Sequence, residues 1–168
     1  MKKSPVFWAL VIGGICILLV LAVNVVLILM KPNDEAQIRE AIEEMRKASL
    51  EHRPGGVLER LSNQFRLPEP YSEEVPNPRY EVSRFIREAK ITKLEIKVNS
   101  IEISGDSAIA KCRLTTDLTF RGIRFNYDGP AELEFQRETK RRLFIIPEPV
   151  WLMRGGTLDP SQIDIFIF

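Results

Sequence analysis

The chain has 168 residues, with 24 basic and 23 acidic side chains and a formal net charge of +1. A balance this even argues against a dedicated nucleic-acid-binding protein, which would carry a strong positive excess. One histidine and the single cysteine outside the uncharged run near the N-terminus are too few for a zinc site, and no calcium-binding loop of the Asp-x-Asp-x-Asp-Gly type is present. We therefore expect no nucleic acid, no metal ion and no cofactor.

The first feature along the chain is a run of 25 residues without a charge, from residue 6 to residue 30. As a helix it would be about 37 Å long, enough to cross a hydrocarbon core of about 30 Å. A cleavable secretory signal has a shorter apolar stretch, of roughly 7–15 residues, followed by a small-residue cleavage site. No such site follows this run, so the sequence predicts a transmembrane signal anchor over residues 6–30.

Charges on the two sides of this run predict its orientation. Lys2 and Lys3 precede it, and acidic residues follow it almost at once. The positive-inside rule then places residues 1–5 in the cytoplasm and the rest of the chain beyond the plasma (inner) membrane. We expect a single-pass protein with one exported, periplasmic domain over residues 31–154 and a C-terminal tail over residues 155–168.

One side of the predicted anchor carries small or polar residues. Wound at about 100° per residue, five positions fall within an arc of about 80°. Small residues let two helices approach closely, and an asparagine can hydrogen-bond across the contact. Packing against another membrane helix and chance placement in a lone anchor both remain open. The five residues are Ala9, Gly13, Cys16, Val20 and Asn24.

Three helices are predicted after the anchor, over residues 34–51, 56–65 and 78–90. Each has apolar side chains that recur at helical spacing. In the second, Val57, Leu58, Leu61 and Phe65 fall on one side. The third has an N-cap at Asn77 and a proline at its first position, Pro78.

From residue 91 the period of the apolar residues changes from 3.6 to 2, which predicts strands. The apolar set changes phase at Asn99-Ser100, and a slipped phase indicates a β-bulge. The predicted strands are residues 91–103, 107–120, 123–137 and 142–153.

Three helices followed by four long antiparallel strands resemble the cone-shaped α+β fold of the nuclear transport factor 2-like superfamily (a cystatin-like cone). The resemblance covers residues 34–153. It rests on element order and length, on the helix–loop–helix opening (IREAIEEMRKASLEHRPGGVLERLSNQF) and on a tryptophan near the end of the last strand (VWLM). It implies a curved four-stranded antiparallel sheet, three helices packed on it and a cavity at the open end. The superfamily includes isomerases, dehydratases, epoxide hydrolases and non-catalytic scaffolds, so the fold alone does not choose a function.

Alternation along the second and third strands predicts which side chains face the interior of the cone. The even positions of 107–120 and the odd positions from 123 to 135 are apolar or weakly polar. The opposite face carries the charged residues and belongs in solvent, where Lys111 or Arg113 can lie across from Glu132 or Glu134. The candidate cavity-lining residues are Cys112, Leu114, Thr116, Phe125 and Tyr127.

General acid–base catalysis needs a positioned His, Asp, Glu or Tyr inside a cavity. The inward positions offer only Tyr127 and the thiol of Cys112. His52, at the end of the first helix, is expected to be a solvated residue that complements the helix dipole. Cys112 has no activating group beside it and is expected to be a small core residue. Enzymes of the superfamily that this chain resembles usually place His and Asp in the cavity, so we expect that this protein is not an enzyme.

Two segments are candidate contact surfaces. The proline-rich stretch 67–78, predicted as a loop, either covers the mouth of the cone or is a passive connector. The C-terminal residues alternate as a strand would, and such a strand can add to a sheet edge in its own domain or in a partner protein. The apolar residues of this candidate partner tail are Ile163, Ile165, Phe166, Ile167 and Phe168.

These features predict a non-enzymatic, membrane-anchored binding or assembly module, a subunit or scaffold of an envelope membrane complex that acts through protein–protein interaction. The alternative is a carrier of a small apolar ligand, or an isomerase- or dehydratase-like enzyme that uses the cone cavity. The expected partners are the lipid bilayer and another membrane or envelope protein, and a homodimer is also open.

Overall fold

The structure is a computed structural model that describes residues 33–68, 75–142 and 146–167. The chain divides into two compact units, Met1–Asn33 and Asp34–Phe168. The predicted anchor over residues 6–30 and its small-residue side (Ala9, Gly13, Cys16, Val20 and Asn24) therefore lie outside the described residues. Within the described ranges, no helix is both long enough and apolar enough to cross a membrane.

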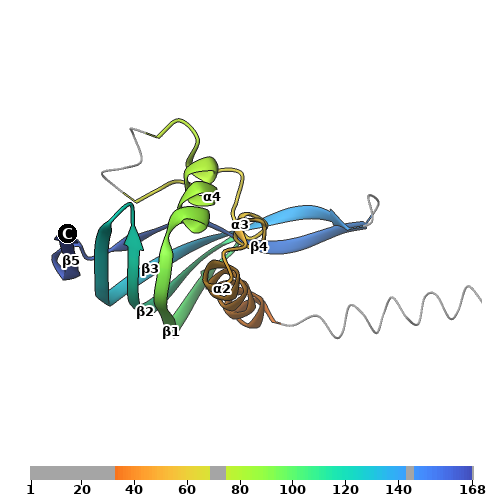
Figure 1. Cartoon of the computed structure of the whole chain (residues 1–168). Helices are drawn as coiled ribbons and strands as arrows, with labels where there is room; N and C mark the ends of the chain where they lie inside the picture. The colour runs from red at the N-terminus through yellow and green to blue at the C-terminus, as the bar shows by residue number, and fades with distance from the viewer. Residues whose placement is uncertain (1–32, 69–74, 143–145, 168) are drawn as a thin grey trace, which may run out of the picture. The chain divides into compact units, whose positions relative to one another are not determined.

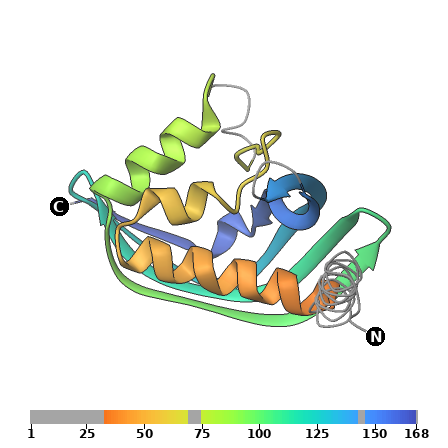
Figure 2. The same ribbon diagram turned by 90° about the vertical axis from the view of Figure 1, so that its right-hand side faces the viewer.

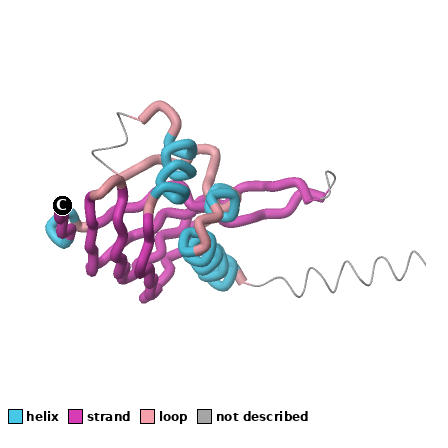
Figure 3. The backbone as a smooth tube through the Cα atoms, in the orientation of Figure 1, coloured by secondary structure: helices cyan, strands magenta, loops and turns pink. Residues whose placement is uncertain are grey.

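The second unit has its helices first and its strands afterwards, which confirms the predicted α+β class (Figure 1). The antiparallel sheet has the order β1-β2-β3-β4, and β5 pairs with β3. Figure 2 shows the sheet curving beneath the three helices, which lie on its concave side, and Figure 3 separates the helical and strand layers by colour. The elements are α2 (Asp34–Leu50), α3 (Pro54–Leu58), α4 (Pro78–Glu88), β1 (Lys90–Ser104), β2 (Ser107–Phe120), β3 (Ile123–Arg142), β4 (Ile146–Leu158), the 3-10 turn η1 (Pro160–Gln162) and β5 (Ile163–Ile167).

The structure confirms the first and third predicted helices, together with the sequence features that predicted them. In α2 the apolar side chains at helical spacing are buried, among them Ile38, Ala41 and Ile42. In α4 the Asn77 side chain accepts a hydrogen bond of 3.1 Å from the backbone N–H of Tyr80. This cap satisfies one of the amides that the first helical turn leaves without a partner.

The second predicted helix, over 56–65, was wrong in its extent, because α3 ends at Leu58. Beyond that point the backbone bonds to β4 instead of continuing the helix. Ser62 N–H donates to the carbonyl of Met153 at 2.8 Å, and Arg66 N–H donates to that of Arg154 at 2.8 Å. The segment thus covers the outer edge of β4, and its apolar side chains are buried there without helical geometry.

The strands confirm the predicted alternation and bulge. The register between β1 and β2 shifts between Val98 and Ser100. Along β2 the even positions face the helices, and the charged odd positions form ion pairs on the other face. Lys111 Nζ lies 2.6 Å from Glu102 Oε1, and Arg113 Nε lies 2.9 Å from Asp128 Oδ1. Lys111 is also opposite Glu132 in the ladder, but its ion pair is with β1.

The third strand is longer than predicted, and the fourth begins later and ends later. β3 continues beyond 137 to Arg142, and β4 runs over 146–158 instead of 142–153. After Gln136, which is opposite the first residue of β2, the residues of β3 pair only with β4. We call this two-stranded extension, residues 137–142 with 146–151, the arm (Figure 1).

The C-terminal segment forms β5 and pairs antiparallel with the start of β3. In the ladder, Ile163, Ile165 and Ile167 are opposite Tyr127, Phe125 and Ile123. The tail was expected to pair with a sheet edge of its own domain or of a partner protein. In the structure it pairs within its own domain. Phe168 lies outside the described residues.

Candidate functional site

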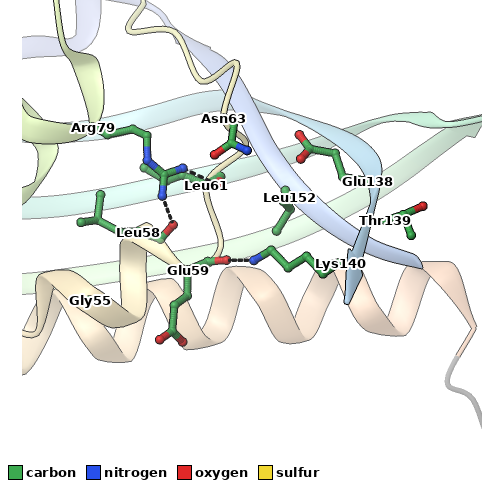
Figure 4. A pocket seen from close by; sticks show the side chains of 10 residues that line it. All are labelled: Gly55, Leu58, Glu59, Leu61, Asn63, Arg79, Glu138, Thr139, Lys140 and Leu152. Carbon is green, nitrogen blue, oxygen red and sulfur yellow. Dashed lines mark hydrogen bonds between the residues drawn. The ribbon is translucent and has the colours of Figure 1, made fainter. Parts of the chain in front are cut away.

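An open groove of about 440 Å³ lies where α3 and the segment after it meet the root of the arm (Figure 4). Leu58 and Leu61 contribute from the α3 side, and Leu152 contributes from β4. Charged and polar groups surround these apolar side chains: Arg79 from the start of α4, and Glu138, Thr139 and Lys140 from β3. The groove therefore combines a charged rim with a floor of apolar side chains, of which Leu58 is half-buried and Leu61 and Leu152 are almost fully buried.

Arg79 is held at one side of the groove by backbone carbonyls. Its guanidinium donates to Leu61 O at 2.7 Å, to Ser62 O at 2.9 Å and to Leu58 O at 2.9 Å. These carbonyls are left without helical partners where α3 ends, and a cation complements the partial negative charge at that end. Arg79 thus fixes the turn after α3 and also supplies positive charge to the groove.

Lys140 reaches the same turn from the arm (Figure 4). Its ammonium group donates to the backbone carbonyl of Glu59 at 2.6 Å, while the Glu59 carboxylate points away from it. Burial lowers the pKa of Lys140, and the positive charges of Arg60 and Arg79 lower it further against the opposing effect of Glu59. Three cations thus lie close to one another at this side of the groove.

Glu138 is an acidic residue of the groove rim on the arm side, and it is bonded to a buried serine. The hydroxyl of Ser62 donates to the Glu138 carboxylate and accepts a bond of 2.9 Å from the N–H of Gln64. Ser62 is buried, so these bonds offset the cost of removing its hydroxyl from water. The contact ties the turn after α3 to the arm.

The five residues predicted to line a cone cavity lie on β2 and β3, and in the ladder Thr116 is opposite Tyr127. Cys112 and Tyr127 are buried, whereas Leu114, Thr116 and Phe125 are half-buried. The Cys112 thiol donates to Ala131 O at 3.3 Å, and burial raises its pKa. A raised pKa disfavours the thiolate, which is the reactive form, so this geometry suits a core residue.

The Tyr127 hydroxyl both donates and accepts a hydrogen bond within the domain. The hydroxyl donates to the carbonyl of Pro130 and accepts a bond of 3.2 Å from the N–H of Asp159. Burial raises its pKa. Gly129 leaves the space for this side chain, because a Cβ at that position would lie 2.9 Å from the hydroxyl oxygen. Tyr127 therefore fastens the connection between β4 and β5 onto β3.

His52 lies at the end of α2 with a φ of 52°, and its Nδ1 is 3.1 Å from the carbonyl of Ile86. It is exposed and links the turn after α2 to α4. Among the described residues, no group of three or more His, Cys, Asp or Glu side chains is arranged to hold a metal ion.

Sequence reasoning missed the groove because its residues come from segments far apart in the chain. The one available signal was Ser62, a polar residue between Leu61 and Phe65 in an apolar stretch. What the arrangement offers chemically is recognition: apolar surface, a carboxylate and two cations that are held in place by carbonyl oxygens.

Neither protein-family profiles nor the curated proteins gave a match to this sequence. Solved structures did match, and they share its NTF2-like fold. An NTF2-like protein of unknown function in nutrient uptake from Rhodospirillum rubrum has a TM-score of 0.57 and 16% identity, over 71% of this chain and 93% of its own. A conserved protein from Planctomyces limnophilus has a TM-score of 0.57 and 16% identity, over 79% of this chain and 98% of its own.

A third structure, a candidate Ca/calmodulin-dependent kinase II association domain from Exiguobacterium sibiricum, has a TM-score of 0.56 and 12% identity. The match covers 79% of this chain and 99% of that one. Likeness at these identities shows the fold alone, because this fold carries many unrelated activities.

Proposed function

We propose that this chain is a non-enzymatic, membrane-anchored binding module that serves as a subunit or scaffold of an envelope membrane complex. The uncharged run over residues 6–30 anchors it in the plasma (inner) membrane, with the N-terminus in the cytoplasm. The domain from Asp34 onward then stands outside the cytoplasm and meets its partner there.

The groove is the observation that carries this proposal. Its apolar floor and charged rim have the composition of a protein-contact surface, in which buried apolar area is surrounded by polar groups. Arg79 and Lys140 are held by backbone carbonyls of residues 58–62, so little side-chain freedom is lost when a partner binds. An anchored partner segment that lies in the groove would gain both apolar contact and charge pairing.

Site-directed photo-crosslinking in intact cells tests this function. A photo-reactive amino acid at Asn63 or Thr139, two groove residues, should give a discrete crosslinked band in the membrane fraction. The same amino acid at Lys97, an exposed residue of β1, is the matched control and should give none. A second substitution, Leu58→Asp in the groove floor, should remove the band. Equal labelling from all three positions, or no band from any, would overturn the proposal.

A second candidate function is a carrier or isomerase-like enzyme that uses the concave face. The observation that favours it is the set of half-buried apolar side chains beside Tyr127, including Leu114 and Phe125. Binding of a small apolar fluorophore that Phe125→Asp abolishes and Leu58→Asp leaves intact would favour this alternative over the groove.

A further inference from the structure

The two cations that line the groove are bonded to neutral acceptors. Arg79 and Lys140 both donate to backbone carbonyls of the turn formed by residues 58–62. A carbonyl oxygen carries only a partial negative charge, so these bonds orient the two side chains without neutralising them. Among the described residues, the ion pairs of the chain include neither Arg79 nor Lys140. The turn thus holds two positive charges in position at the groove.

The carboxylates of this region are turned away from these cations or are bonded elsewhere. The Glu59 carboxylate points away from the cation that its own carbonyl binds (Figure 4). Glu138 accepts a hydrogen bond from a buried serine hydroxyl, and Glu44 forms an ion pair with Arg60. The positive charge at this side of the groove is therefore balanced only in part.

The pKa of Lys140 agrees with this imbalance. Burial lowers it, the positive charges of Arg60 and Arg79 lower it further, and the negative charges of Glu59 and Glu138 oppose the change without reversing it. Like charges held close together make the charged form of each less favourable. An anion bound between Arg79 and Lys140 would offset this repulsion.

Apolar surface lies beside the two cations. Leu58 belongs to the turn that binds them and is half-buried, so part of its side chain is accessible. The groove is open and has a volume of about 440 Å³, which lies within the range of sites that hold a drug-sized ligand. A ligand that fits both features has an anionic group next to an apolar one, as does a peptide segment with adjacent acidic and apolar residues.

The donors and the acidic residues of the rim favour a carboxylate over a phosphate. The carbonyls of the turn take three of the five N–H donors of Arg79 and one of the three of Lys140. A ligand oxygen can bond to other N–H groups of both side chains while these bonds persist. The carboxylates of Glu59 and Glu138 repel an anion in proportion to its charge, so a single negative charge is preferred to a dianion.

We propose that the groove binds an acidic peptide segment of the partner, with the side-chain carboxylate of a glutamate or aspartate between Arg79 and Lys140. A neighbouring apolar side chain of the same segment contacts Leu58. This inference rests on the proposed function and deepens it, because it states the chemistry by which the groove selects its partner. The acidic residue also sets the position of the segment, since the turn holds both cations in place.

Binding of two matched peptides tests this selectivity. The full chain in phosphatidylcholine nanodiscs is titrated into Ser-Leu-Glu-Leu-Ser or Ser-Leu-Gln-Leu-Ser, each with a neutral fluorophore at its N-terminus and an amide at its C-terminus. Fluorescence anisotropy gives the two dissociation constants. We expect the glutamate peptide to bind roughly tenfold more tightly, which is the lower end of the contribution of a hydrogen bond between charged groups. Equal dissociation constants, or no binding of either peptide, would overturn the inference.

Variants of Lys140 separate its charge from its place in the fold. Lys140→Gln should reduce the tenfold preference to roughly threefold, because only one of the two cations then faces the carboxylate. Lys140→Arg keeps the charge and should keep the preference. Lys97→Gln removes the same charge from an exposed position of β1 and should change nothing. An unchanged preference in Lys140→Gln, or an equal loss in Lys140→Arg or in Lys97→Gln, would overturn the inference.

Two further measurements identify the anion and separate this inference from the proposed function. Inorganic phosphate should displace no more of the glutamate peptide than potassium chloride of the same ionic strength, and stronger displacement would overturn the assignment to a carboxylate. Photo-crosslinking from Asn63 in intact cells tests the function independently. A crosslinked band without a preference for the glutamate peptide would overturn this inference alone. A preference for that peptide without a band would overturn the proposed function and support the acidic specificity of the groove.

Discussion

The two halves of the concave face are built from the same strands but are covered differently. On β2 the inward residues Ala108, Ala110 and Cys112 have exposed fractions of 3%, 0% and 2%. The next inward residues of that strand, Leu114 and Thr116, are only half-buried. We call the first part the closed half and the part from Leu114 onward the open half.

The difference comes from α2 and not from the strands. α2 packs against β1 and β4 and belongs to a core cluster that includes Ala108, Ala110, Phe135 and Trp151. The small side chains of Ala108 and Ala110 on the sheet and of Ala41 on α2, all nearly or fully buried, leave room for a close approach. Strand alternation thus predicts which face a side chain occupies, but only the helix above it decides how deeply that side chain is buried.

The largest expected effect is a contrast between two phenylalanines of β3. Phe135→Ala in the closed half should lower the free energy of unfolding by about 3–5 kcal/mol, because a buried ring leaves a cavity. Phe125→Ala in the open half should cost less than half as much, since that ring is already partly in water. Urea unfolding of the full chain in mild detergent, followed by circular dichroism, measures both. Equal losses would mean that the two halves are packed alike.

A second contrast adds volume instead of removing it. Ala110→Leu places three extra carbons under α2 and should destabilise the domain by about 1–3 kcal/mol through overpacking. Thr116→Leu puts the same side chain on the same face of the same strand in the open half, where it adds one non-hydrogen atom and removes the bond of 3.0 Å from the Thr116 hydroxyl to the carbonyl of Lys93. It should cost no more than about 0.5–1.5 kcal/mol, the usual contribution of one hydrogen bond, in the same assay. A large loss at Thr116 would show that the open half is filled.

Much of this architecture could be predicted from local sequence. The bulge near Asn99, the cap at Asn77 and the inward positions of β2 and β3 each depend on signals within a few residues. The end of α3 could not be predicted, because Leu61 and Phe65 satisfy a helical spacing while the backbone between them bonds to β4.

The groove, and the edge with which the tail pairs, could not be predicted from the sequence for the same physical reason. Lys140 meets the carbonyl of Glu59 across 81 positions of the chain, and no local pattern marks that contact. The alternation of Ile163, Ile165 and Ile167 indicated an edge strand correctly. It could not indicate which edge, since any sheet with an unpaired edge offers the same hydrogen bonds.

Removing the hydroxyl of Tyr127 should have a smaller effect on the free energy of unfolding. This effect tests whether the hydroxyl has a structural role or is available for catalysis. Tyr127→Phe loses the bonds to Pro130 and Asp159 and should cost about 0.5–1.5 kcal/mol of unfolding free energy. Tyr80→Phe, at an exposed position of α4, is the matched control and should change nothing. An unchanged stability in Tyr127→Phe would leave the hydroxyl available for chemistry and would favour the alternative function.

The smallest effect tests the boundary between the halves at Cys112, the last inward residue of β2 with near-complete burial. Because burial raises the pKa of this thiol in the native state, the native chain keeps its proton at pH values where the unfolded chain has lost it. The unfolded pKa is about 8.5. Stability should therefore fall as the pH rises above that value, with a slope of at most about 1.4 kcal/mol per pH unit for one group.

Comparison of stability between pH 8 and pH 10 in the wild type and in Cys112→Ala isolates this contribution. The variant should lose less stability over the range, because alanine has no proton to release. Tyr127 adds a decline of the same sign in both proteins, beginning near pH 10, because its pKa is also raised. Because Cys112 is the smallest of the causes that raise the pKa of Tyr127, this decline largely cancels in the comparison. Equal slopes would place Cys112 in the open half, in contact with water, and the boundary on β2 would then lie between Ala110 and Cys112.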